Sequence, residues 1–443
     1  MQPAPLECTV SRRSGPAGLA ALAVLVALTA AACGPSHPSP SASPAQTTAP
    51  THQHPAATGQ PGQAAPAAAQ ERTRVQFEQL MGQHALVAVR LMRTIEADEP
   101  DLRSASTAAL QANGQALGEL VGTQFGSGER ASFDQVWRRH QDELLRYAQA
   151  VKGGDEAARK AAAAALMASC DAYAAWLGGA THGRVSAASA KAVMHEHADE
   201  LTSQADAYGS GDYSAAYRIE REAYEHMFAL GTTVAKASLD AKDAARLDTP
   251  PEQLRSAFAM LLGEHMELIT GAQRATFAKP AEFQAAGEQM NANTAALTKA
   301  MGAIVGPARA KEFQAGWSAH VDTLVAYGAA AARGDQAGKA AAERKLDTLA
   351  VGLARYLSTI VKGRLQVGLL TGAITEHDRH LLDQVDAYAA KDYAKAYSME
   401  VDGYQQMRTV ADTLVDAIGH TVKPGLPKGG SQTGGGGMAQ RRP

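Results

Sequence analysis

The chain has little of several features on which whole classes of protein depend. Aromatic residues make up 5% of its 443 residues, and the formal net charge is −3. This near-neutral balance provides no basic field of the kind that binds nucleic acid, so we expect no nucleic-acid partner. The sequence also lacks a P-loop, a nucleophile elbow and a His-Glu-x-x-His zinc motif. These absences make an enzyme the least favoured of the functional classes.

Cysteine is scarce as well, and its three occurrences have different contexts. Cys8 lies in a segment that we expect to be removed, Cys33 follows that segment, and Cys170 lies in an Ala-rich stretch far along the chain. Once Cys33 is modified, Cys170 has no partner for an intramolecular disulfide. We therefore predict that Cys170 is a small buried hydrophobic residue.

The first 32 residues have the three parts of a secretion signal. Two arginines, Arg12 and Arg13, precede the apolar run 19–28, which is too short to span a bilayer. Small residues then lead to Cys33 and a glycine, which resembles a bacterial lipobox. We predict cleavage before Cys33, attachment of diacylglycerol to its thiol, and a lipid anchor on the extracytoplasmic side of the cell membrane.

One position departs from the usual lipobox. Lipoboxes normally carry Leu three residues before the cysteine, and this chain has Ala30 there. The alternative is ordinary cleavage after Ala32, which would release a secreted protein. Either route places the protein outside the cytoplasm.

Two segments are too polar and too rich in Pro, Gly and small residues to bury a core. Residues 33–70, rich in Pro, Ala, Ser, Thr and Gln, are predicted to form a disordered tether after the lipidated cysteine. Residues 421–443, rich in Gly, are predicted to form a disordered tail. Between them lies the only region that we expect to fold.

Residues 71–420 are Ala-rich, and their apolar residues recur at spacings of three and four, which predicts helices throughout. Gly and Pro stand mainly at the ends of the predicted segments, and Asp155 and Asp212 are plausible N-caps. We predict an all-α fold with about six helices in each of two antiparallel bundles. The segments of the first half are 73–96, 101–124, 130–152, 155–178, 186–209 and 212–241.

The second half of this region repeats the first at an offset of about 180 residues. Rare residue types match along most of the length, and the boundary falls near Pro250. We therefore predict two tandem bundles, 71–245 and 250–420, each long enough for its own core. The matches include Phe133 with Phe313, Trp137 with Trp317, Tyr147 with Tyr327, Tyr217 with Tyr397 and Glu220 with Glu400.

Three histidines recur in each copy, always within the apolar stripe of their helix, which predicts that they point into the bundle. Counting residues from the helix ends places them at a similar height, together with an Asn, a Tyr and a Met. We predict one polar layer per bundle, with the histidines as ligands and the other residues supporting them. The histidines are His84, His140 and His197, then His265, His320 and His377. The supporting residues are Asn113, Tyr224 and Met227, then Asn293, Tyr404 and Met407.

Neutral imidazoles suit copper, zinc, iron and nickel, and three of them leave an open coordination position. We therefore hypothesise that each layer binds a transition metal, with copper, zinc or iron as candidates, or a small ligand. The alternative is a structural or adaptor lipoprotein, in which the layer is a hydrogen-bonded network that fixes helix register and no metal is bound. A redox metalloenzyme ranks third.

The order of these residues is similar to helical repeats in uncharacterised bacterial secreted proteins, over most of residues 75–420. The resemblance implies the helical fold and the polar layer. Some such proteins are labelled as relatives of copper amine oxidases, but those enzymes are β-rich and use an Asn-Tyr-Asp/Glu motif that this chain lacks. We therefore expect no amine oxidase activity. The matching residues are His84, Asn113, Trp137, His140, Glu196, His197, Asp212 and Tyr213.

Overall fold

The computed structural model describes residues 66–98, 100–278 and 280–419, and every regular element within them is a helix. This confirms the predicted all-α fold. The helices of the first half are α1 (Pro66–Ala97), α2 (Pro100–Phe125), α3 (Ser127–Gly153), α4 (Glu156–Ala180), α5 (Ala187–Gly209) and α6 (Tyr213–Ser238). The short α7 (Ala241–Arg246) precedes α8 (Pro250–Ala275), α9 (Pro280–Val305), α10 (Pro307–Ala332), α11 (Gln336–Ile360), α12 (Val367–Ala389) and α13 (Tyr393–Gly419).

The helix ends have identifiable causes in the sequence. The side chains of Asp155 and Asp212 each accept a hydrogen bond from the backbone N–H three residues later, so both predicted N-caps are confirmed. Pro307 begins α10, where its fixed φ suits a helix and its missing N–H is not needed. Gly154 ends α3 with φ at 64°, a left-handed conformation that glycine adopts without steric cost.

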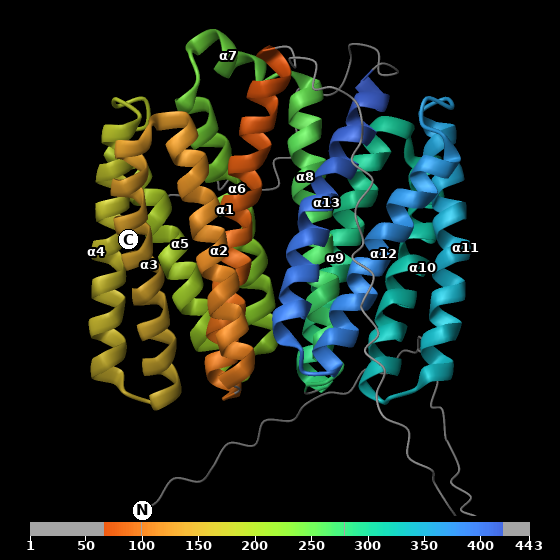
Figure 1. Cartoon of the computed structure of the whole chain (residues 1–443), viewed down its shortest axis with the longest axis horizontal. Coiled ribbons are helices and arrows are strands. Elements are labelled where there is room, and N and C mark those ends of the chain that lie inside the picture. Colours follow the sequence, from red (N-terminus) through yellow and green to blue (C-terminus); the bar gives the residue numbers. More distant parts are fainter. Residues whose placement is uncertain (1–65, 99, 279, 420–443) are drawn as a thin grey trace, which may run out of the picture. The chain divides into compact units, whose positions relative to one another are not determined.

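The long helices fall into two groups of six. Within each group, helices that follow one another along the chain contact each other, and the last packs against the first, α6 against α1 and α13 against α8. Because the connections are short, consecutive helices run antiparallel. Figure 1 shows α1–α6 on one side and α8–α13 on the other, with α1, α6, α8 and α13 where the groups meet. This grouping is compatible with the predicted tandem repeat.

Each group buries apolar side chains along its length. Phe77 belongs to the core of the first group and Phe258 to the core of the second. The second core also takes in Leu86, Tyr224 and Phe228, which belong to α1 and α6 of the first group. The surface between the two groups is therefore continuous with an apolar core.

Helices α1 and α6 approach closely at one glycine. A Cβ built on Gly231 would lie 2.5 Å from Cα of Glu78, on the facing helix. Contacts this short do not occur for real Cβ atoms, so any larger residue would push the two helices apart. This glycine therefore sets the spacing of the helix pair that borders the second group.

Contacts between the two groups are reciprocal. Helix α2 contacts α13, and its counterpart α9 contacts α6, the counterpart of α13. Helix α1 likewise contacts α8, which matches it in the repeat. At the centre of this surface the hydroxyls of Tyr224 and Tyr404 lie 3.2 Å apart and share a hydrogen bond. These two residues occupy matching positions, 180 residues apart.

Buried ion pairs near this surface also repeat, one within each group. Arg93 pairs with Glu220 at 2.7 Å, and its counterpart Arg274 pairs with Glu400 at 2.7 Å. Each guanidinium also lies over two tyrosine rings, a favourable cation–π arrangement. The rings belong to Tyr208 and Tyr217 for the first arginine, and to Tyr388 and Tyr397 for the second.

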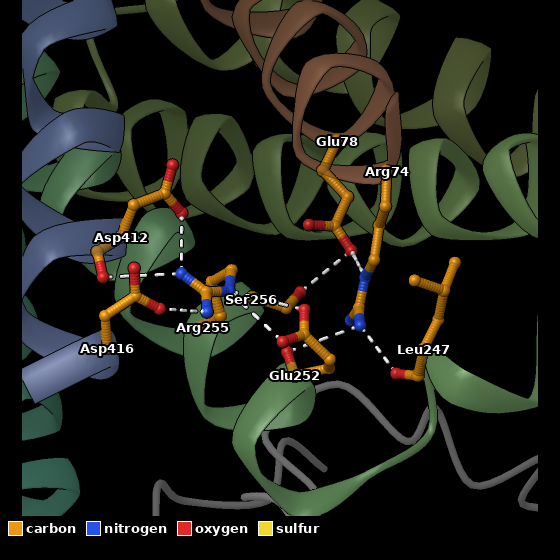
Figure 2. Close-up of polar contacts among 8 residues, drawn as sticks. All are labelled: Arg74, Glu78, Leu247, Glu252, Arg255, Ser256, Asp412 and Asp416. Atoms are coloured by element: carbon orange, nitrogen blue, oxygen red, sulfur yellow. Dashed lines mark hydrogen bonds and ion pairs between the residues drawn. The ribbon is translucent and has the colours of Figure 1, made fainter. Parts of the chain in front are cut away.

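Figure 2 shows a polar cluster that joins α1, α8 and α13. Arg74 donates from Nε to Glu78 at 2.6 Å and from its guanidinium to the carbonyl oxygen of Leu247, also at 2.6 Å. Arg255, the counterpart of Arg74, donates to Asp416 at 2.6 Å. Both arginines also contact Glu252, but their other partners differ between the two halves. The cluster also includes Glu252, Ser256 and Asp412.

Candidate metal centres

The first candidate centre lies inside the first group, where three histidines from alternate helices meet. His84 of α1, His140 of α3 and His197 of α5 have ring centroids 5.5 to 5.7 Å apart. All three side chains are fully buried. One nitrogen of each ring lies within 4.8 Å of a nitrogen in each of the other two. We call this set the first triad.

The second triad repeats this arrangement at matching positions. His265 of α8, His320 of α10 and His377 of α12 have ring centroids 5.5 to 6.0 Å apart. Their exposed fractions are 0 to 4%, and their nitrogens also fall within 4.8 Å of one another. The structure therefore brings all six sequence-predicted histidines together in two sets of three.

Most triad nitrogens have no hydrogen-bond partner among the protein groups in the described ranges. This is true of both nitrogens of His84, His197, His265 and His377. A neutral imidazole has one donor and one acceptor, and an unpaired buried polar group costs about 1–3 kcal/mol. A structural hydrogen-bonded layer would pair these atoms. The arrangement is therefore better suited to a ligand bound among the rings.

Burial also keeps the triad rings neutral. It lowers the pKa of His140 and of His320 from 6.5 to about 4, because the charged form is poorly solvated there. Burial likewise lowers the pKa of His84 well below 6.5, and the neighbouring His140 and His197 lower it further. Neutral rings keep a nitrogen lone pair available, which is the form that binds metal ions.

The distances within each triad are close to those of a three-histidine metal site. Zinc–nitrogen bonds of about 2.0–2.1 Å place the bound nitrogens about 3.4 Å apart. Nitrogens that lie within 4.8 Å of one another need each move inward by less than about 1 Å. Small rotations of the imidazole rings supply that movement, so the residues present fit a metal ion.

A tryptophan covers one histidine of each triad. The ring centroid of Trp137 lies 4.4 Å from that of His84, and Trp317 lies 4.6 Å from His265. We predicted these tryptophans as core residues, and both are buried. An apolar shell of this kind controls solvent access to a metal site.

Beside the first triad lie a hydroxyl and a thiol. Ser169 Oγ is 3.4 Å and Cys170 Sγ 3.8 Å from Nδ1 of His140. Cys170 is fully buried, as predicted, and burial raises the pKa of its thiol to about 12. In the second half, Leu349 and Ala350 occupy the two matching positions. The thiol and hydroxyl therefore belong to the first centre only.

Beside the second triad lies a carboxylate. Asp378 Oδ1 is 3.6 Å from Nδ1 of His320, slightly beyond hydrogen-bond distance. Burial, and then the charge of Asp347, raises the pKa of Asp378 to about 8. The matching residue in the first half is Ala198. Asp378 is not predicted from the sequence, because it does not repeat between the halves. The signal for it is the presence of Asp in place of Ala next to a triad histidine.

The two predicted asparagines brace helices rather than histidines. Asn113 donates to a backbone carbonyl of α1 at 2.9 Å and to the side chain of Gln83 at 3.1 Å. Asn293 makes the matching contacts on α8, with Glu264 in place of the glutamine at 2.6 Å. Both asparagines therefore hold the helix that carries the first histidine of each triad, and neither orients an imidazole by direct hydrogen bonding.

The predicted tyrosines lie away from the triads, which corrects our placement of them in the polar layer. The ring of Tyr224 packs against Gly82 of α1, where an added Cβ would lie 2.7 Å from it. Gly82 and His84 are two residues apart and so lie about 200° apart around the helix. Tyr224 is thus on the opposite face of α1 and bonds to Tyr404. Met227 and Met407 pack in the two apolar cores.

Two histidines outside the triads pair with carboxylates near the surface. His195 lies 2.7 Å from Asp171, and Nδ1 of His226 lies 2.5 Å from Glu200. Glu196, Glu200 and His226 also form a third group with metal-ligand spacing, but the group is partly exposed. Glu376, His380 and Gln406 take its positions in the second half, so it is not repeated.

A cavity of about 250 Å³ opens between α2 and α3. Its lining includes Trp137, which packs on the first triad, and four charged side chains, those of Arg130, Asp134, Arg138 and Asp142. This tryptophan therefore lies between the triad and a polar cavity. In the second half, Ala310, Gln314 and Ser318 take the positions of the first three, and Asp322 takes that of Asp142.

Comparison with known proteins identifies no relative. No family model matches the chain, and no curated protein or solved structure matches it. Cys33, the tether 33–70 and the tail 421–443 lie outside the described residues, so the signal and the lipid anchor stay predictions. Within the described ranges, no helix combines the length and apolar character needed to cross a membrane.

Proposed function

We propose that each helical group binds one transition-metal ion through its three histidines, so that the chain holds two ions. The observation that carries this proposal is the convergence of three buried imidazoles in each half, with nearly all of their nitrogens lacking a partner in the described protein. A bound ion would accept the lone pairs that are otherwise unpaired. The repeat of the whole arrangement adds weight, because a single buried histidine is more often structural.

The burial of the sites favours binding over catalysis. The triad histidines are at most 4% exposed, and a tryptophan covers each set. Catalytic metal sites keep a position open to substrate. A closed site of this kind suits an ion that is held and released slowly, so we favour metal storage or buffering over an enzymatic role.

The sequence features of the N-terminus give the proposed location. With Cys33 as the lipid attachment site and residues 33–70 as a tether, the helical region would hang from the outer face of the membrane. The metal would then be taken up outside the cytoplasm. Without lipidation the same protein would be secreted.

Packing supports one competing function, a structural or adaptor lipoprotein with no metal. Each triad lies among tightly packed aromatic and apolar side chains, as ordinary core residues do. In that case the histidines would fix the register of alternate helices. This alternative leaves the unpaired nitrogens without an explanation.

Elemental analysis separates the two functions. The full chain, purified in mild detergent and loaded in turn with copper, zinc and iron, should retain about two equivalents of one or more metals, one for each triad. The double variant His140→Gln, His320→Gln should lose them. A matched variant in which His182 and His195, outside both triads, become Gln should keep them. Absence of bound metal under every loading condition would support the structural alternative.

A further inference from the structure

The two triads differ in the donor atom that lies beside them. Sγ of Cys170 is 3.8 Å from a nitrogen of the first triad, and Oδ1 of Asp378 is 3.6 Å from a nitrogen of the second. Each donor is replaced by alanine in the other half, at Ala350 and Ala198. We propose that the two centres are different metal sites: the first binds monovalent copper, Cu(I), and the second binds divalent zinc.

The first centre has the chemistry that Cu(I) prefers. Thiolate sulfur and imidazole are soft or borderline ligands, and thiolate selects Cu(I) in particular. In the described part of the chain, no carboxylate forms an ion pair with a histidine of this triad. The thiolate of Cys170 is the anionic donor beside this triad, and its one negative charge balances the one positive charge of Cu(I). When copper binds, the thiol proton leaves to solvent and a copper–sulfur bond forms.

The second centre has the chemistry that zinc prefers. Three imidazoles and one carboxylate oxygen are common zinc ligands and give four-coordinate geometry. Asp378 is 5% exposed, and its Oδ1 has no hydrogen-bond partner in the described protein. When zinc binds, the carboxyl group of Asp378 releases its proton to solvent, and the resulting carboxylate offsets one of the two charges that the divalent ion brings into the buried site. It is a poor ligand for Cu(I), which favours sulfur.

The inference rests on the proposed function, so each centre must be tested alone in the full chain. Changing His320 and His377 to Gln leaves only the first centre, and changing His84 and His140 to Gln leaves only the second. Cu(I) is supplied from a bicinchoninate buffer and Zn²⁺ from a nitrilotriacetate buffer. The affinity of each single-centre protein for each ion is then measured by competition, with circular dichroism as the check on folding.

We expect opposite preferences in the two single-centre proteins. In the first, Cys170→Ser should weaken Cu(I) binding by about tenfold to a hundredfold, and in the second, Asp378→Asn should weaken Zn²⁺ binding by a similar factor. As controls, Asp378→Asn in the first protein should leave its Cu(I) affinity unchanged, and Cys170→Ser in the second should leave its Zn²⁺ affinity unchanged. Adding Ala198→Asp to the first should raise its affinity for Zn²⁺.

X-ray absorption on the unaltered chain provides a second measurement that needs no variant. Copper should show a sulfur ligand, and zinc should show nitrogen and oxygen only. Equal ion preference in both centres, or zinc bound to sulfur, would overturn the inference and leave the two-site function standing. Failure of both centres to bind either ion would overturn the proposed function as well.

Discussion

The two halves of the molecule place the same three histidines and the same tryptophan in the same relation, but they surround them differently. The first triad has a thiol, a hydroxyl and a nearby polar cavity. The second has a buried carboxyl group, and small or neutral side chains match three of the four charged residues that line that cavity. What both halves share is the framework that brings three imidazoles together. The side chains next to the imidazoles differ, and these neighbours could give the two halves different ligand preferences.

Acid should destabilise both halves by a similar and large amount. The folded protein holds His140 and His320 neutral, with each pKa lowered from 6.5 to about 4, whereas the unfolded chain protonates them near 6.5. Unfolding therefore takes up protons, and the stability that these groups provide is present above pH 6.5 and is lost as the pH falls toward 4. Each histidine should account for on the order of 3 kcal/mol.

Urea unfolding of the metal-free chain, in the presence of a chelator, measures this loss between pH 7 and pH 4.5. His140→Gln and His320→Gln should each flatten the pH dependence, and by similar amounts. If one of the two substitutions left the slope of the unfolding free energy against pH unchanged, the two triads would not be equally buried.

Neutralising the buried glutamates of the interface should affect the two halves unequally. Glu400 pairs with both Arg90 and Arg274, whereas Glu220 pairs with Arg93 alone. Removing one partner of a buried ion pair typically costs about 3–5 kcal/mol, because the remaining charge is left uncompensated. We expect Glu400→Gln to reach that range and Glu220→Gln to fall below it, in the free energy of unfolding. Equal losses would mean that the second arginine adds nothing.

The tyrosine pair should show a smaller effect that the two halves share. The hydroxyls of Tyr224 and Tyr404 bond to each other, and each also contacts a backbone carbonyl, of Met260 and of Gln79 respectively. Tyr224→Phe and Tyr404→Phe therefore each remove the shared hydrogen bond, worth about 1 kcal/mol, together with a contact of their own. The double variant should cost less than the sum of the single variants, because the shared bond is lost only once. Fully additive losses would show that the two hydroxyls act independently.

The smallest change in stability should come from the pair of His226 and Glu200, which occurs in the first half alone. Its pH dependence should be opposite to that of the triad histidines. The hydrogen bond to Glu200 raises the pKa of His226 above 6.5, outweighing partial burial. Its stabilising effect is therefore present below pH 6.5 and is lost as the pH rises through the raised value. Since the pair is partly exposed, we expect a few tenths of a kcal/mol. Glu200→Gln should remove this effect in urea titrations, while His380→Gln in the second half should not.

Much of the fold follows from the sequence, because helical periodicity is a local property of the chain and the repeat is visible when the two halves are aligned. The histidines were predicted to converge from two local quantities, their position on the apolar stripe and their distance from the helix ends. Neither quantity predicts which neighbouring helix will pack against a given face of a helix. Tyr224 has the correct height, but it lies on the face of α6 that packs toward the second half. Contacts between the halves depend on docking surfaces that no single helix reveals.

Cys170 and Asp378 illustrate a second limit. Each differs from its counterpart in the other half, so positions that repeat between the halves do not include it. Only the packing of α4 against α3, and of α12 against α10, shows that each lies beside a triad nitrogen. A donor residue that is present in one half only cannot be found by matching the two halves.

The pairing of Tyr224 with Tyr404 has a consequence for the architecture. A residue that meets its own counterpart is the mark of an isologous contact, in which the same patch is used by both partners. Such a contact is saturated by two units, unlike the head-to-tail stacking that lets solenoid proteins lengthen repeat by repeat. A third bundle appended to this chain would find the joining patch already in use. This joining patch therefore accommodates two helical groups, and each of them brings one histidine triad.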